Sequence, residues 1–229
     1  MKIAFLGFDF AEGKTKYMDN RLISLSEKFS PQKTTYFSVE FLKEDFAACD
    51  AMILSKVKSL DLFILDMDKL DVRQQRITDD KEKEFFKKCI GYLEKEIPLC
   101  DVEFSPEESL LIREIAPYSL KPTLIQEEQL DTKIIIEKIL EKSKVIFFYT
   151  VGKKEVRAWP VDKDSDIITC AGKIHSDLAR GFIKADVINF NDFTEEHSMQ
   201  TAKAKGLVKL VDRDYIIQDG DIIEIRFNV

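Results

Sequence analysis

The sequence predicts an α/β protein with two parts, and three observations support this fold class. Apolar residues make up 45% of the 229-residue chain and charged residues 34%, with few Gly and Pro, a balance typical of an ordered, helix-rich protein. Strand-like and helix-like segments alternate through the first 143 residues, as in a mainly parallel sheet. From residue 144 the pattern changes to β-rich runs with short helices between them. We therefore expect one domain in residues 1–143 and a second in residues 144–229.

The first part is expected to begin with a strand, a helix and a second strand. Residues 2–8 contain a continuous apolar run that predicts a short buried strand. Asp19 or Asn20 can cap a helix that Ser30-Pro31 ends. The apolar face of this helix consists of Leu22, Ile23, Leu25 and Phe29. Residues 35–42 alternate between apolar and polar side chains, which predicts a strand.

Residues 45–97 are mostly helical in pattern, with a possible short strand at 51–54 and a polar break near 78–80. Two helices packed as a hairpin fit this segment best. In the second helix the apolar residues recur at spacings of three and four, which predicts a buried stripe rather than a cofactor site. These residues are Phe85, Phe86, Cys89, Ile90, Leu93 and Ile97.

A further helix and a strand–helix pair complete the first part. Ser105-Pro106-Glu107-Glu108 has a Ser cap, Pro at the first helical position and the Ser-x-x-Glu capping box, so a helix is expected to start there. Residues 123–126 predict a short strand after Lys121-Pro122, and Asp131 is expected to start the next helix.

The second part has the element order of a β-grasp domain. Residues 145–151 and 155–161 are β-rich runs on either side of Gly152-Lys153-Lys154, which predicts a hairpin. The elements expected after it are a helix at 167–175, a strand at 182–190, a helix at 198–205 and two late strands around Asp219-Gly220-Asp221. Fewer than 90 residues carry this whole set.

No metal site and no catalytic constellation is predicted. The four cysteines are scattered without a C-x-x-C pair, and buried thiols are expected. The alternating acids of residues 162–166 lack the glycine and distal Glu of a calcium loop, and residues 219–221 are expected to form a turn. His175 has no nucleophile or orienting acid at a defined spacing, so a structural or helix-capping role is expected.

The apolar pattern and the N-terminal residues favour a cytoplasmic protein without a membrane partner. No apolar run reaches the roughly 18 residues that a membrane span needs, and the N-terminal residues enter a strand-like run without signal-peptide zones. The net charge is −7, of which residues 1–143 hold 22 basic and 28 acidic groups and the rest 13 and 14. Any surface that binds a polyanion must therefore be local.

The second part closely resembles the C-terminal TGS domain of the YchF (Obg-like ATPase) family. The resemblance covers nearly all of residues 144–229 through long motifs in the family's order. These motifs are residues 151–159, 171–177, 180–185 and 214–221, with Arg226-Phe227-Asn228-Val229 at the end. The departures are Pro160 after Trp159, and Leu178-Ala179 where the family has an aromatic residue and an acid.

The first part resembles the same family more weakly, as a shortened and degenerate P-loop-NTPase-like domain. The matching residues occur in family order and are Asp19-Asn20-Arg21-Leu22, residues 29–35, Val39-Glu40-Phe41 and Lys121-Pro122. The family's nucleotidase domain is interrupted by a helical arm. Residues from about 58 to 97 are similar to a shortened version of that arm.

A phosphate loop has the spacing G-x-x-x-x-G-K-[ST], which turns backbone N–H groups toward the phosphate and leads directly into a helix. Five residues separate Gly7 from Gly13-Lys14-Thr15, one more than the motif has, and the next credible cap is Asp19. Alignment with the family suggests that the phosphate loop and its helix are missing. Residues 42–45 also replace the family's D-x-x-G, and residues 126–128 lack its base-reading Asn.

These losses predict a protein that uses no cofactor and does not turn over ATP or GTP. The alternative is a nucleotide-binding protein or weak NTPase that holds ATP or GTP with Mg²⁺ through a remodelled loop from Gly7 to Thr15. In that alternative Gly13, Lys14 and Thr15 would contact the phosphates.

The resemblance to TGS domains implies contact with RNA, the ribosome or a translation-associated protein. The residues we expect to make this contact are Lys153, Lys154, Arg157, Trp159, Lys173, Arg180 and Lys184, since basic groups beside aromatic rings can hold phosphates and stack bases. Burial of Trp159 in the β-grasp core is the competing interpretation. A protein-interaction scaffold that uses the acidic first part is a third hypothesis. The sequence does not indicate an oligomeric state.

Overall fold

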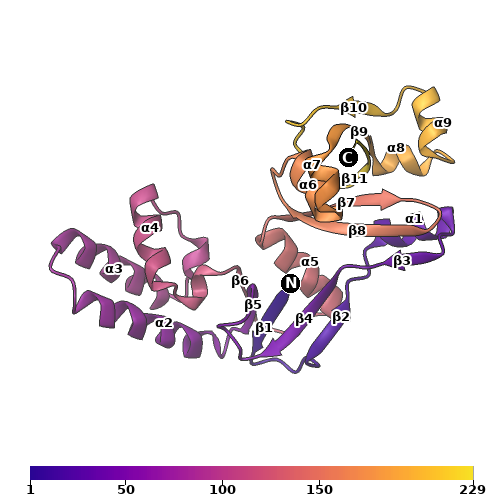
Figure 1. Ribbon diagram of the computed structural model, residues 1–229. Coiled ribbons are helices and arrows are strands. Elements are labelled where there is room, and N and C mark those ends of the chain that lie inside the picture. The colour runs from indigo at the N-terminus through magenta and orange to yellow at the C-terminus, as the bar shows by residue number, and fades with distance from the viewer. Residues whose placement is uncertain (229) are drawn as a thin grey trace. The chain divides into compact units, whose positions relative to one another are not determined.

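The structure, a computed structural model, describes residues 1–228 (Figure 1), which form two compact units. The first unit contains residues 1–15 and 39–142, and the second contains residues 16–38 together with the chain from residue 143 onward. The sequence predicted a single boundary between the two parts, between residues 143 and 144. The structure differs from it in one segment, because residues 16–38 belong to the second unit.

The first unit contains a five-stranded sheet with the spatial order β2-β4-β1-β5-β6. The strands are β2 (Gly13–Lys16), β4 (Ser38–Lys43), β1 (Lys2–Leu6), β5 (Ala51–Ser55) and β6 (Thr123–Gln126). β1 pairs in parallel with β4 and with β5, and β5 pairs in parallel with β6. The predicted mainly parallel sheet is therefore confirmed. The carboxyl ends of these four strands meet at one edge, where open α/β sheets bind their ligands.

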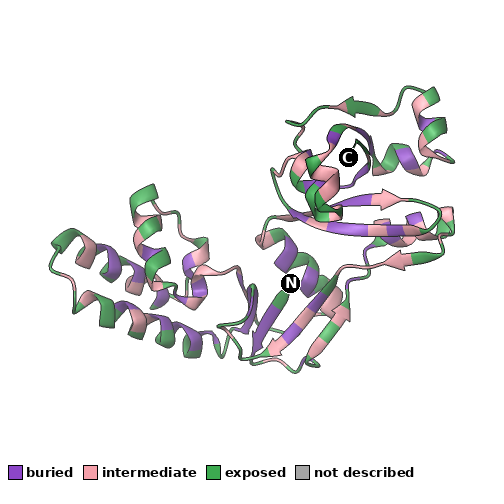
Figure 2. Cartoon of the chain, viewed as in Figure 1, coloured by how far each residue is buried: buried purple, intermediate pink, exposed green. Residues whose placement is uncertain are grey.

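The helices of the first unit include the predicted helical hairpin. They are α2 (Ser59–Gln74), α3 (Asp80–Leu93), α4 (Pro106–Ile115) and α5 (Thr132–Lys142), with short 3₁₀ turns η1 (Leu99–Asp101) and η2 (Tyr118–Leu120). Figure 2 shows that the facing sides of α2 and α3 are buried. The predicted capping box is present at the start of α4, where Ser105 and Glu108 cap each other's backbone N–H. Within residues 1–228, none of the helices has the length and apolar content that crossing a bilayer requires.

The second unit contains a six-stranded mixed sheet with the spatial order β10-β9-β11-β7-β8-β3. The strands are β10 (Lys209–Val211), β9 (Phe182–Asn189), β11 (Asp221–Phe227), β7 (Val145–Val151), β8 (Glu155–Asp162) and β3 (Lys33–Thr35). β7 and β8 form the predicted antiparallel hairpin, and β11 lies beside β7 in parallel. β9 pairs antiparallel with β11 and with β10. This arrangement confirms the predicted β-grasp fold.

Helices cover both faces of this second sheet. They are α1 (Asn20–Phe29), α6 (Ile167–Ile174), α7 (Ser176–Arg180), α8 (Phe190–Thr194) and α9 (Met199–Ala204). Phe148 packs in one buried cluster with Ile167 and Cys170 of α6. α1 packs against β7 and β8, and neighbouring side chains alternate between the two faces of a strand. The sheet is therefore enclosed by α6 on one face and by α1, a helix from the N-terminal part of the chain, on the other.

Polar contacts connect α1 to β7, and the one between Asp19 and Tyr149 is buried. Asp19 caps α1 by accepting a hydrogen bond from Arg21 N at 3.0 Å, and its other carboxylate oxygen accepts one from the hydroxyl of Tyr149. The guanidinium of Arg21 donates two hydrogen bonds to Asp219, at 2.8 and 3.1 Å. Asp219 in turn accepts from Phe147 N at 3.0 Å. We call Asp19, Arg21, Tyr149 and Asp219 the polar clamp, and it explains why residues 16–38 fold with the second unit.

The strands differ from the expectation in three places. The strand expected over residues 35–42 is two strands, β3 and β4, which belong to different sheets. β2 was not predicted, because four residues of Gly, Lys and Thr carry no apolar alternation. The late strands were expected on either side of residues 219–221, but β10 lies earlier, at Lys209–Val211, and only β11 adjoins that turn.

The roles expected for His175 and for the turn at residues 219–221 are confirmed. His175 Nδ1 accepts a hydrogen bond from Asp177 N at 3.1 Å and so caps α7. Residues 219 and 220 form a turn, in which Gly220 has a φ of 93°, a conformation that side chains with a Cβ rarely adopt. Of the four cysteines, Cys100 is only half-buried and the other three are buried as expected.

An ion-pair network on β9 predicts how stability depends on pH. Asp186 is 3% exposed and accepts hydrogen bonds from Arg226 at 2.7 and 2.8 Å. Lys203 lies 2.9 Å from the same carboxylate. Burial alone would raise the pKa of Asp186, but the hydrogen bonds from Arg226 and Lys203 outweigh burial and lower it. A carboxylate whose pKa is lower in the folded state contributes stability above its unfolded value, and this contribution is lost as the pH falls through the lowered pKa.

Asp186→Asn is therefore expected to lower the free energy of unfolding by about 1–3 kcal/mol at pH 7, because the charge-assisted hydrogen bonds are weakened. The difference from the wild type should shrink as the pH falls below about 4, where the unfolded carboxyl becomes protonated. Urea unfolding followed by the fluorescence of Trp159, the only Trp, measures this in the second unit. Asp192→Asn, at an exposed acid of the same unit, is the control. A difference that stays constant from pH 7 to pH 3 would contradict the assignment.

Candidate functional site

The loop between β1 and β2, residues 7–12, occupies the place where a phosphate loop would follow the first strand. Phe10 is 9% exposed, and its ring lies 5.5 Å from the ring of Phe5 in a T-shaped contact and 5.5 Å from that of Phe41 in a stacked contact. Phe8 contacts Phe10 at 5.6 Å. The loop is therefore packed onto the sheet by aromatic rings.

Backbone groups of this loop are bonded to a neighbouring loop. Asp9 N donates to the side-chain oxygen of Gln129 at 3.1 Å, and the side-chain nitrogen of Gln129 donates to Asp9 O at 3.2 Å. At Gly7, φ is 78°, and an added Cβ would lie 2.0 Å from Ser55 Oγ, so only glycine fits. The Asp9 N–H is thus engaged by a side chain, and the Asp9 carboxylate adds negative charge near the place that a phosphate would need.

Gly13, Lys14 and Thr15 lie in β2, at the edge of the sheet. Directions alternate along an extended strand, so successive N–H groups do not converge on one anion. The next helix, α1, begins only at Asn20 and belongs to the second unit. The three residues therefore form neither the amide nest nor the helix start that hold a phosphate in a P-loop.

The other two nucleotide-binding positions carry different residues as well. Leu42 and Lys43 are the last residues of β4, and Glu44 follows with a φ of 55°. Gln126 ends β6, and its side-chain nitrogen donates to the backbone oxygen of Ile125 at 2.8 Å. These positions therefore carry neither the aspartate of the family's D-x-x-G motif nor its base-reading asparagine.

Five of the seven predicted contact residues lie in four places of the second unit: the β7–β8 turn, α6, α7 and β9. Lys153 and Lys154 are exposed at the tip of this hairpin, and Lys173 is exposed on α6. Arg180 pairs with Asp177 at 2.8 Å, and Lys184 pairs with Asp212 at 2.9 Å. Arg180 and Lys184 are thus partly neutralised, whereas no ion pair involves Lys153 or Lys154 among the residues described.

The remaining two predicted residues, Arg157 and Trp159, contact each other. The Arg157 guanidinium carbon lies 3.7 Å from the centre of the Trp159 ring, a cation–π contact. Trp159 is 9% exposed, stacks on Phe148 with an interplanar angle of 7°, and donates from Nε1 to Thr150 at 3.0 Å. This environment supports the interpretation of Trp159 as a core residue, and its ring offers little surface for stacking a base.

A groove of about 530 Å³ lies beside the hairpin tip and was not predicted. The side chains that matter for its chemistry are Ile174, Leu178, Ile225, Phe227, Lys153 and Lys154. They come from α6, α7, β11 and the β7–β8 turn, so no local sequence pattern indicates that they lie together. Their only signal in the sequence is the apolar alternation of β11, which continues to Phe227 although that side chain is 48% exposed.

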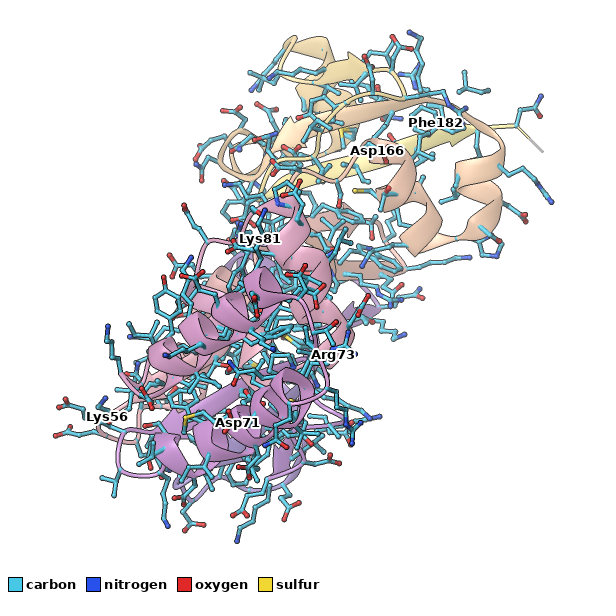
Figure 3. All side chains as sticks on the ribbon, turned by 90° about the vertical axis from the view of Figure 1, so that its left-hand side faces the viewer. Lys56, Asp71, Arg73, Lys81, Asp166 and Phe182 are labelled. Atoms are coloured by element: carbon cyan, nitrogen blue, oxygen red, sulfur yellow. The ribbon has the colours of Figure 1, made fainter. Side chains whose placement is uncertain are left out.

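A hollow of similar volume lies on the helical arm of the first unit. It is lined by residues of α2 and α4, including Lys69, Arg73 and Glu114. Arg73 and Asp71 are labelled on α2 in Figure 3. Arg73 pairs with Glu114 at 3.5 Å, and Lys69 lies over the ring of Tyr118 at 3.1 Å. Arg73 and Glu114 are thus paired with each other, and Lys69 is engaged by an aromatic ring.

Comparison with known proteins gives concordant results. The family model YchF-GTPase_C, described as a protein of unknown function (DUF933), matches residues 145–228. The chain is 48% identical over 82 residues to "Ribosome-binding ATPase YchF" of Mycoplasma genitalium, covering 36% of this chain and 22% of that protein. It is 32% identical over 212 residues to the Bacillus subtilis protein of the same name, covering 91% and 55%. "Obg-like ATPase 1" of Danio rerio is 44% identical over 105 residues, 44% of this chain and 26% of that protein.

Among solved structures, that of the Schizosaccharomyces pombe YchF GTPase matches with a TM-score of 0.78 at 15% identity, over 99% of this chain and 97% of that one. This likeness shows the fold alone. The chain spans between 22% and 55% of the length of the three relatives named above. The fold and the domain match define a P-loop-NTPase-like α/β unit joined to a β-grasp domain. The chain is related to the YchF and Obg-like ATPases.

Proposed function

We propose that this protein is a non-catalytic, ribosome-associated binding protein whose second unit contacts the translation apparatus. The observation that carries the proposal is the contrast between two segments. A stretch of 82 residues is 48% identical to a protein named ribosome-binding ATPase, and the YchF-GTPase_C model matches residues 145–228, whereas Gly13, Lys14 and Thr15 of the first unit lie in an edge strand. The first unit then serves as a scaffold.

The hairpin tip supports an electrostatic contribution to this contact. Lys153 and Lys154 are adjacent, exposed and outside every ion pair found among residues 1–228. Ribosomes carry acidic groups on both their RNA and their proteins, and ion contacts between exposed lysines and such groups weaken as salt rises. The whole-chain charge of −7 does not attract a polyanion, so a local contact of this kind is required.

Co-sedimentation of the full chain with purified ribosomes tests the proposal. We expect association at low salt that decreases as salt rises, and a further decrease in the variant Lys153→Glu/Lys154→Glu. Lys163→Glu, at an exposed lysine of the same unit away from the hairpin tip, is the matched control and should associate like the wild type. The absence of association at low salt would contradict the proposal.

Isothermal titration with ATP and GTP in the presence of Mg²⁺ tests the non-catalytic part. We expect no binding heat, because Gly13, Lys14 and Thr15 are in an extended strand. Binding that is lost in Lys14→Ala, or release of phosphate by the purified protein, would favour the alternative in which a remodelled loop holds the nucleotide.

A further inference from the structure

Among residues 1–228, no strand lies beside one edge of β11 at its carboxyl end. In the parallel pairing of β11 with β7, Ile222 stands opposite Tyr149, so Val151, the last residue of β7, stands opposite Glu224. The chain then turns away into the hairpin. On its other side β11 stays paired with β9 as far as Phe227, whose Cα partner is Phe182, the residue labelled in Figure 3. Residues 225–227 are therefore paired with β9 on one side and face no β7 residue on the other.

This unpaired edge borders the groove beside the hairpin tip. Ile225 and Phe227 come from β11 itself, and Ile174 and Leu178 form the adjoining apolar wall. Phe227 is 48% exposed. An unpaired strand edge next to an apolar pocket is the arrangement by which a domain accepts an extended peptide, since main-chain hydrogen bonds hold the peptide and pockets receive alternate side chains.

The charges around the groove indicate which charge its ligand should carry. Lys153 and Lys154 border it without an ion-pair partner among the described residues. Glu155 and Glu224 border it as well, but Glu155 pairs with Lys33 at 3.2 Å and Glu224 with Lys203 at 3.2 Å. The uncompensated charge is thus positive and confined to the hairpin tip, which complements one or two carboxylates.

We propose that this groove binds an extended segment of a ribosomal protein, in which an acidic residue stands next to a large apolar residue. The apolar side chain packs against Leu178 and Phe227, and the carboxylate lies at Lys153 and Lys154. The inference rests on the proposed function and names the class of partner at the same surface.

The same features disfavour RNA as the occupant of the groove. RNA recognition by a sheet needs exposed aromatic faces on which bases stack. Trp159 is buried and covered by Phe148 and Arg157. The groove wall is aliphatic apart from Phe227 and so offers no series of aromatic faces on which bases could stack.

Site-specific photocrosslinking to ribosomes tests the inference. The full chain carrying Phe227→p-benzoyl-L-phenylalanine is bound to ribosomes purified from the organism that makes it, irradiated, and digested separately with RNase and with protease. We expect a crosslink that resists RNase and is destroyed by protease. Mass spectrometry should find Asp or Glu within a few residues of the crosslinked position. Leu210→p-benzoyl-L-phenylalanine, at a side chain that is 50% exposed on β10, is the control and should give no such product.

The outcomes separate the two proposals. Reversing the charges with Lys153→Glu/Lys154→Glu should reduce the yield of the Phe227 crosslink by about tenfold. A crosslink to ribosomal RNA, an equal protein crosslink from Leu210, or co-sedimentation without any crosslink from Phe227 would overturn the peptide assignment while ribosome association stands. Failure of the unmodified chain to co-sediment would overturn both proposals.

Discussion

Replacing Asp19 by alanine is expected to lower the free energy of unfolding of the second unit by about 2–4 kcal/mol. Two losses add in this variant. The side-chain cap of α1 disappears, which costs about 1 kcal/mol. The buried hydroxyl of Tyr149 also loses its acceptor, and leaving a buried donor unsatisfied costs about 1–3 kcal/mol. Burial and the charge of Asp19 raise the pKa of Tyr149, so its hydroxyl is protonated and needs an acceptor at neutral pH.

Urea unfolding followed by Trp159 fluorescence measures the free energy of unfolding of the second unit, since Trp159 is in the core of that unit. Asp166→Ala is the matched control, because Asp166 caps α6 through Thr169 N at 2.7 Å and is outside the polar clamp. Its cost should be that of a cap alone, about 1 kcal/mol. Equal losses for the two variants would mean that the contact between Asp19 and Tyr149 contributes nothing to stability.

A double-mutant cycle isolates the contact itself. Tyr149→Phe keeps the cap of α1 but removes the hydroxyl, and should cost about 1–3 kcal/mol. If the clamp acts as one unit, the double variant Asp19→Ala/Tyr149→Phe should lose clearly less than the sum of the two single variants. Additive losses would contradict the coupling of α1 to β7 through these two side chains.

Elements with a strong local signal could be predicted from the sequence. The hairpin was expected at 145–151 and 155–161 and was found at Val145–Val151 and Glu155–Asp162. The capping box at Ser105 and Glu108 fixed the start of α4 to the residue. Both rest on contacts between residues that are close in the chain, which periodicity and capping rules detect.

The sequence could not predict that residues 16–38 belong to the second unit, because this depends on contacts between residues that are far apart in the chain. The helix over residues 20–29 was expected, but nothing in its own sequence shows that Asp19 meets Tyr149, 130 positions away. β3 and β4 were read as one strand for the same reason, since alternation gives no information on which sheet a strand joins. The family match begins at residue 145, so it leaves out a helix and an edge strand of the unit that it identifies.

The candidate site also combines residues that a local sequence pattern predicts with residues that only the folded structure brings together. The sequence identified the exposed lysines of the hairpin tip, because a turn between two strands brings its polar residues to the surface. It did not identify the apolar wall, since Ile174, Leu178 and Phe227 come from three elements separated by other secondary structure. It also listed Trp159 as a contact residue, whereas cross-strand pairing with Phe148 and the cover by Arg157 bury its ring. Side-chain exposure depends on the partner strand, which a single sequence does not specify.

Phe10→Ala is expected to destabilise the first unit by about 3–5 kcal/mol, the range for truncating a buried phenylalanine. Phe10 contacts Phe5 and Phe41, which belong to two neighbouring strands, so its removal leaves a cavity over the sheet. Unfolding followed by far-UV circular dichroism, with Trp159 fluorescence reporting the second unit separately, measures the loss. Phe8→Ala, in the same loop but only half-buried, is the control and should cost clearly less.

The Phe10 variant also separates two accounts of the nucleotide site. If the aromatic ring merely blocks an otherwise intact phosphate site, removing it should allow ATP or GTP to bind in the presence of Mg²⁺. We expect no binding, because residues 13–15 remain in a strand and Asp9 N remains bonded to Gln129. An anion site needs several N–H groups that converge on one point, and a cavity lined by Phe5 and Phe41 supplies none. Tight nucleotide binding by Phe10→Ala would contradict this, because it would show that an intact phosphate site lies beneath the Phe10 ring.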